Sequence, residues 1–197
     1  MGQGRDLVIL SHQNNADMSS WYPFATDLAD QRFQVLVFNF RGFCSGAGDA
    51  ECSGGSKDPA AAVDDLEAAM AWVRKELDPR RVFLVGASMG GTASLIAAAR
   101  NRVYGVATVS APHSFEGLDV PPATLRDIGE PKLFIAGADD PARAASAAEY
   151  FYDEAGDPKQ IFIAPSEEHG APMLETPEGL EARDRLIRFL DVYRDAA

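Results

Sequence analysis

The segment VGASMGG, residues 85–91, places a serine between closely spaced glycines. Ser88 has Gly86 two residues before it and Gly90 two residues after it, which is the pattern G-x-S-x-G. In a nucleophile elbow the serine takes a strained backbone conformation, and the residues two positions away come too close to carry side chains. The pattern therefore indicates a serine nucleophile. A packing role for Ser88 is the alternative, because the bare pattern also occurs by chance.

The context of this segment favours the nucleophile. Residues 81–86 are typical of a buried strand, and an alanine-rich helix begins near Gly90. A serine at a helix N-terminus stands where the helix dipole and free N–H groups favour a developing anion. Two other glycine-rich sites are excluded. A Walker loop needs a lysine that is missing here, and a dinucleotide fingerprint needs its second glycine where Ser88 stands.

A serine nucleophile needs a base, and the base needs an acid that orients it. The chain has three histidines, His12, His113 and His169, and each follows an expected strand. His169, in SEEHGAP, stands between the last expected strand and the final helix, so it is the preferred base. His12 would approach the elbow from the wrong side, and His113 follows the strand at 105–110.

The acid candidates, Asp139 and Asp140, are neighbours in FIAGADDPA, after the expected strand at 132–137. Either one could instead be a solvated residue of an Asp-Pro turn.

The elements that must position these residues alternate along the chain. Short apolar segments, typical of strands buried on both faces of a parallel sheet, occur at 6–11, 34–40, 81–86, 105–110, 132–137 and 160–165. Helical spacing of apolar residues occurs between them at 21–28, after the expected caps Ser19 and Ser20, at 58–77, and from Thr176 onward.

This alternation predicts a three-layer α/β sandwich with a mostly parallel six-stranded sheet, formed by residues 1–197 as one domain. Ligands of such sheets bind beyond the carboxyl ends of the strands, where Ser88, Asp139, Asp140 and His169 all lie.

Composition narrows the expected partners. The chain carries 18 basic and 30 acidic residues, a net charge of −12. An acidic surface repels nucleic acid and anionic membranes, so neither is expected as a partner. The apolar run at the N-terminus is only about four residues long, too short for a signal peptide or a membrane span, and this favours a cytoplasmic location.

The two cysteines, Cys44 and Cys52, are too few for a structural zinc site, which takes about four ligands. We expect free thiols in a reducing compartment. The alternative is a bridge that closes the glycine-rich loop between them.

Together, the motifs of this sequence resemble those of the α/β-hydrolase superfamily over nearly the whole chain. LVGASMGG resembles its elbow, IAGADDP its acid loop, EEHGAPML its histidine loop and FNFRGFCSG its D-x-R-G-x-G-x-S loop. The order serine, acid, histidine is also that of the family. Because the family's acid usually stands three residues after the glycine, the resemblance implies the triad Ser88, Asp140 and His169.

The resemblance also implies an oxyanion hole. LSHQNNAD falls where the family carries its His-Gly loop, but Gln13 replaces the usual glycine, and Asn39 stands where aspartate is frequent. The expected donors are the backbone N–H of Met89 and that of Asn14 or Gln13.

The family's first two strands are expected to be missing, because the chain starts at what looks like the third. The cap domain is also expected to be missing, since only residues 111–131 separate two sheet strands. Four large side chains near these loops could line an acyl pocket or belong to the core: Trp21, Phe43, Phe115 and Met173.

The expected function is hydrolysis of a small-molecule ester through an acyl-enzyme, with acyl groups of roughly two to six carbons, and with no metal or cofactor. Three alternatives remain open. They are a cofactor-free perhydrolase or haloperoxidase-like enzyme, a dienelactone-hydrolase relative, although those carry cysteine as nucleophile, and a hydrolase-fold binding protein without activity.

Overall fold

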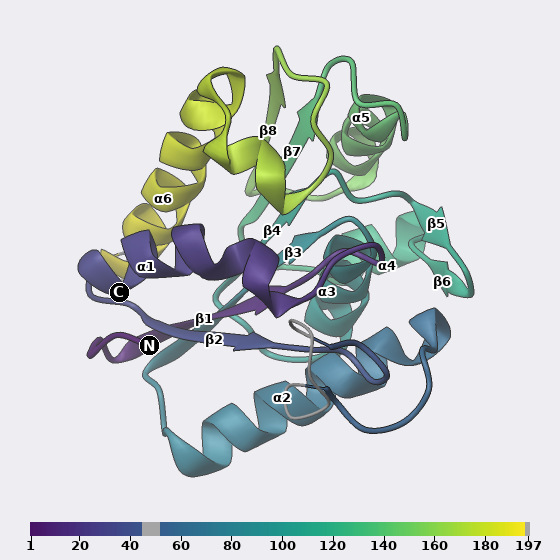
Figure 1. Cartoon of the computed structure of the whole chain (residues 1–197). Helices are drawn as coiled ribbons and strands as arrows, with labels where there is room; N and C mark the ends of the chain where they lie inside the picture. Colours follow the sequence, from purple (N-terminus) through teal and green to yellow (C-terminus); the bar gives the residue numbers. More distant parts are fainter. Residues whose placement is uncertain (45–51, 196–197) are drawn as a thin grey trace.

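The computed structural model describes residues 1–44 and 52–195 and contains the expected parallel sheet (Figure 1). The strands are β1 (Asp6–Ser11), β2 (Gln34–Phe38), β3 (Arg81–Ala87), β4 (Gly105–Val109), β7 (Lys132–Gly137) and β8 (Lys159–Ala164). Their order across the sheet is β2-β1-β3-β4-β7-β8, and every neighbouring pair is parallel. The prediction of six strands in an α/β sandwich is confirmed. The second strand ends at Phe38, two residues earlier than expected.

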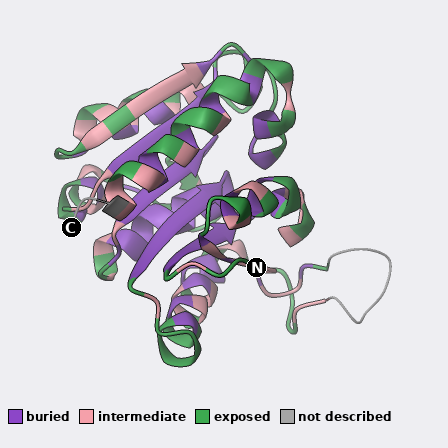
Figure 2. Ribbon diagram, turned by 90° about the vertical axis from the view of Figure 1, so that its left-hand side faces the viewer, coloured by how far each residue is buried: buried purple, intermediate pink, exposed green. Residues whose placement is uncertain are grey.

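Helices cover both faces of this sheet, which explains why its central strands are largely apolar. Along β1, Leu7 and Ile9 join one core cluster while Val8 and Leu10 join the other. The first cluster lies under α2 (Ala62–Glu76), α3 (Met89–Arg100) and α5 (Ala144–Glu154), and the second under α1 (Tyr22–Asp30) and α6 (Leu180–Asp195). Figure 2 shows the central strands buried between helices whose outer faces are exposed.

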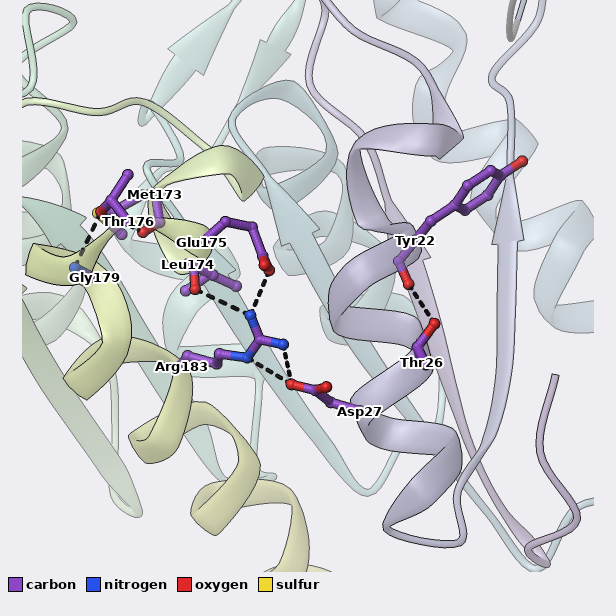
Figure 3. A network of polar contacts seen from close by, with 9 residues as sticks. All are labelled: Tyr22, Thr26, Asp27, Met173, Leu174, Glu175, Thr176, Gly179 and Arg183. Atoms are coloured by element: carbon purple, nitrogen blue, oxygen red, sulfur yellow. Dashed lines mark hydrogen bonds and ion pairs between the residues drawn. The ribbon is translucent and has the colours of Figure 1, made fainter.

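Two short 3-10 helices lead into α1 and α6. Asp17 caps η1 (Met18–Trp21), where its side chain accepts a hydrogen bond from the backbone N of Ser19 at 2.8 Å. The expected caps Ser19 and Ser20 are therefore wrong, because the carboxylate that precedes them takes the free N–H. Thr176 caps η5 (Pro177–Gly179) as the sequence suggests, with its hydroxyl 3.1 Å from the backbone N of Gly179 (Figure 3).

Between β4 and β7 the chain forms only small elements. They are the hairpin β5 (Ser114–Phe115) and β6 (Leu118–Asp119), followed by α4 (Pro122–Asp127). Residues 111–131, all of which the structure describes, thus hold one short helix and no inserted cap domain. None of the helices in the described ranges is long and apolar enough to cross a membrane.

The cysteine prediction is wrong, because the structure joins Cys44 and Cys52 in a disulfide. The two residues face each other in an antiparallel bridge. Backbone hydrogen bonds hold the two sides of the loop together, from Gly42 to Gly54 at 3.2 Å and from Ser53 to Phe43 at 2.9 Å. This pairing places the two thiols within bonding reach.

Candidate active site

Ser88 stands at a sharp turn between β3 and α3. Its backbone torsions are φ 48° and ψ −119°, a left-handed conformation that non-glycine residues rarely adopt. A Cβ atom at Gly86 would lie 2.2 Å from the carbonyl oxygen of Gly90, and one at Gly90 would lie 2.4 Å from that of Ser11. Both glycines are therefore required by close backbone approach, as the elbow pattern predicts.

The turn leaves a backbone donor beside the serine. The N–H of Ser88 is occupied, since it donates to the carbonyl of Val109 on β4 at 2.9 Å. Met89 is the first residue of α3, where an N–H has no partner within the helix. In the described ranges, neither this N–H nor that of Asn14 donates a hydrogen bond. Donors of this kind can stabilise an oxyanion.

Asp140 and His169 meet although 29 residues separate them. The ring nitrogen Nδ1 of His169 lies 2.8 Å from Oδ2 of Asp140, and the Asp140 side chain is fully buried. The other carboxylate oxygen accepts a hydrogen bond from the backbone N of Ala142 at 2.9 Å. Two donors thus fix the Asp140 carboxylate, and the His169 ring points its second nitrogen, Nε2, away from it.

Asp139 has a different environment. It is exposed, and its backbone N donates to the carbonyl of Ser166 at 3.1 Å. A Cβ atom at Gly137 would lie 2.5 Å from the same Ser166 carbonyl, so the acid loop and the histidine loop are in direct contact. This contact turns the Asp139 side chain to solvent and leaves Asp140 facing His169.

The structure brings two of the three triad candidates into contact. No hydrogen bond between the Ser88 hydroxyl and His169 is present in the described part of the chain. The Ser88 residue is largely buried at 7% exposure, and the imidazole of His169 is 24% exposed. Catalytic hydrogen bonds are often long or poorly aligned without substrate and tighten only when substrate binds.

The two other histidines have separate surroundings. His12 is fully buried, and its Nε2 accepts a hydrogen bond from the backbone N of Phe40 at 3.1 Å. Because that nitrogen accepts, Nδ1 carries the proton and donates to the carbonyl of Gln13 at 2.9 Å. Both nitrogens are occupied, so His12 ties two loops together and has none left for Ser88. His113 is exposed and packs against Tyr150, with ring centroids 5.6 Å apart.

Burial lowers the pKa of His12 below its ordinary value of 6.5. Since the unfolded chain binds a proton that the folded chain does not, the free energy of unfolding falls as the pH drops below that value. We expect His12→Asn to flatten this fall between about pH 7 and 5, by at most about 1.4 kcal/mol per pH unit. Chemical denaturation of both proteins at several pH values measures it. Identical pH slopes would show that His12 titrates alike in both states.

The residue after His12 has a role that the sequence did not reveal. Gln13 is 4% exposed, and its side chain reaches the histidine loop, where Oε1 accepts a hydrogen bond from the backbone N of Ala171 at 3.0 Å. Its amide nitrogen donates to the side-chain oxygen of Asn15 at 2.9 Å. The only sign of this role in the sequence was that Gln13 stands where the hydrolase family usually has glycine.

The expected pocket residues are mainly core. Trp21 and Met173 are fully buried in the cluster beneath α1 and α6, so neither lines an open pocket. Phe43 is 2% exposed and packs edge-on against His12 at 4.7 Å. Phe115 is half-buried against the opposite cluster. Aromatic and thioether side chains favour burial when the fold offers it, which explains these corrections.

A cavity of about 530 Å³ lies beside the acid loop. Its walls come from the loop after β4 and from the start of α5: Pro112, His113, Ser114, Ala142, Arg143, Ser146, Ala147 and Tyr150. Ala142 is the residue whose backbone N donates to Asp140, so the cavity borders the loop that holds the candidate acid. Several of its lining residues are exposed, so the cavity opens to solvent.

The histidine loop continues into η4 (Ala171–Glu175), which α6 holds from below (Figure 3). Arg183 on α6 contacts the carboxylate of Glu175 at 2.7 Å and that of Asp27 on α1. The far end of the loop is thereby fixed to two helices. Among the described residues, no group of three or more histidine, cysteine or acidic side chains could hold a metal ion.

Comparisons with known proteins agree with this architecture. The chain is similar to the uncharacterized protein YfhR of Escherichia coli K12. The two are 27% identical over an alignment of 208 positions, which covers 93% of this chain and 69% of YfhR. Among solved structures it is similar in fold to the monoacylglycerol lipase of Paleococcus ferrophilus (18% identity, 98% and 97% of the two chains, TM-score 0.76). It is likewise similar to a dienelactone hydrolase of Anabaena variabilis (20% identity, 98% and 87%, TM-score 0.75).

A family model described as the alpha/beta hydrolase fold matches residues 6–126, well over half of the chain. This range includes the elbow and the strands that carry it. The chain belongs to the alpha/beta hydrolase fold family.

Proposed function

We propose that this protein is a serine hydrolase that cleaves small carboxylic esters with Ser88, His169 and Asp140. The observation that carries the proposal is the 2.8 Å contact between His169 Nδ1 and the buried carboxylate of Asp140. An ionised carboxylate in that place keeps the proton on Nδ1, so Nε2 is free to accept one. Ser88 follows β3, which lies two strands away from β7 in the sheet. Its hydroxyl would supply that proton.

In the proposed reaction, Nε2 of His169 takes the proton from Ser88 Oγ as the oxygen attacks the ester carbonyl. The carbonyl oxygen becomes negative and is held by the N–H groups of Met89 and Asn14. The bond to the alcohol then breaks, and His169 returns its proton to the leaving oxygen. Water attacks the acyl-enzyme by the same route, which releases the acid and restores the Ser88 hydroxyl.

We place the acyl group in the cavity between the loop after β4 and the start of α5. A cavity with exposed walls removes only part of each methylene from water, so each gains less than the ~0.8 kcal/mol of full burial. For p-nitrophenyl esters from acetate to palmitate, we therefore expect kcat/KM to be highest for acyl groups of roughly two to six carbons. A steady rise beyond about eight carbons would instead require a closed acyl channel.

The test of the proposal is hydrolysis of p-nitrophenyl acetate by the purified protein. We expect turnover clearly above the buffer rate with this substrate. No turnover above the buffer rate, with this substrate and with butyrate, would favour a hydrolase fold without esterase activity.

A further inference from the structure

The side chain of Gln13 links two loops that flank the candidate nucleophile. It extends from the loop after β1, and Oε1 accepts the hydrogen bond from Ala171 N at 3.0 Å, across 158 residues of sequence. The contact is buried, and Gln13 itself is 4% exposed. Its other end is also engaged, through the 2.9 Å bond from Nε2 to Asn15. Both polar ends of the amide therefore have fixed partners.

The backbone of the histidine loop is shaped around this amide. Gly170, between His169 and Ala171, has φ 72°, and a Cβ atom there would lie 2.0 Å from Oε1 of Gln13. The amide thus occupies the space that any side chain at position 170 would take. The loop that carries His169 therefore makes room for the Gln13 amide at Gly170, the residue directly after His169.

The main chain of Gln13 is held as firmly as its side chain. Its carbonyl accepts hydrogen bonds from the ring of His12 at 2.9 Å and from the backbone N of Ala16 at 3.2 Å. Asn14, whose N–H is the proposed second oxyanion donor, is the next residue along. Gln13 is therefore adjacent in sequence to that donor, and its side chain binds two residues beyond the proposed base.

We infer that Gln13 is a positioning residue, which sets the distance between the His169 loop and the oxyanion donor at Asn14. This inference rests on the proposed function for its catalytic consequence. Misplacing a catalytic group by about 1 Å can cost about 100-fold in rate, so a link of this kind acts mainly on kcat. The cavity lined by the loop after β4 and by α5 does not involve Gln13, and KM should change little.

Three substitutions separate the acceptor from the bulk of the side chain. Gln13→Met keeps the length and removes both polar atoms. Gln13→Asn keeps the amide but is one methylene shorter, which withdraws the acceptor from Ala171. Gln13→Glu keeps an acceptor oxygen for Ala171, and the exposed Asn15 amide can turn to donate to the other oxygen. Gln160→Met, at an exposed position on β8, is the matched control.

Two readouts are needed. Turnover is measured per active site, with sites counted by a fluorophosphonate that labels serine hydrolases. We expect kcat to fall about 10- to 100-fold in Gln13→Met and Gln13→Asn, to fall less in Gln13→Glu, and to stay at the wild-type value in Gln160→Met. A purely structural role would lower the number of labelled sites and leave turnover per site unchanged.

Hydrogen exchange of the peptide that contains residues 169–175 is the second readout. We expect it to exchange faster in the Met and Asn variants and near the wild-type rate in the Glu variant. Wild-type turnover per site in a folded Met or Asn variant would overturn the inference, as would equal losses in all three variants. If the wild-type protein has no esterase activity, the proposed function fails, and exchange alone still decides whether Gln13 holds the loop.

Discussion

Replacement of Ser88 by alanine is expected to lower kcat/KM for p-nitrophenyl acetate by about 10³-fold or more. The hydroxyl is the group at the elbow that would form the acyl-enzyme, and without it His169 would have no proton to accept. Ser88 Oγ has no hydrogen-bond partner within the described ranges, and alanine keeps the same backbone requirement at φ 48°. The melting temperature should therefore stay near the wild-type value.

The control for this variant is Ser94→Ala on the same helix. Ser94 is buried, and its hydroxyl donates to the carbonyl of Gly90 at 2.7 Å, one turn earlier. This variant loses a local hydrogen bond and should keep its turnover. Near-wild-type hydrolysis by Ser88→Ala, in preparations free of other esterases, would falsify the assignment of the nucleophile.

Asp140→Asn is expected to cost about 10³- to 10⁴-fold in kcat. The asparagine amide can donate a hydrogen bond toward Nδ1 of His169, which places the ring proton on Nε2. That tautomer cannot accept the proton of Ser88. The substitution barely changes volume, so the buried site should still fold, and steady-state kinetics with a thermal melt measure both effects.

Asp139→Asn is the matched control, since it makes the same chemical change one residue earlier. The Asp139 side chain is exposed, and its backbone N is bound to Ser166. We expect nearly wild-type turnover from it. Equal losses in the two variants, or a larger loss in Asp139→Asn, would contradict the choice of Asp140 as the orienting acid.

The sheet was predictable because its central strands are buried on both faces. Residues 7–10, for example, are continuously apolar, and short apolar segments that alternate with helices are typical of a parallel sheet. The elbow was equally clear, since the close approach of Gly86 to Gly90 leaves a direct trace in the residue types. Local rules, applied over a few residues, were sufficient for both.

Features that depend on distant contacts were not predictable. Composition does not say that Cys44 and Cys52 face each other, because the backbone pairing of Gly42 with Gly54 and of Phe43 with Ser53 decides it. Trp21 and Met173 are near candidate loops in sequence but point into the core. The contact between Gln13 and Ala171 joins segments near the two ends of the chain. Local sequence showed only that an unusual residue stood at position 13.

The most direct test of the nucleophile is to map where a fluorophosphonate binds. The probe forms a covalent bond with an activated serine, so the wild-type protein should gain one adduct, and peptide mass spectrometry should place it on Ser88. The Ser88→Ala variant should gain none, and Asp140→Asn should react much more slowly. An adduct on another residue, or no adduct on a folded wild-type protein, would contradict the claim that Ser88 is an activated nucleophile.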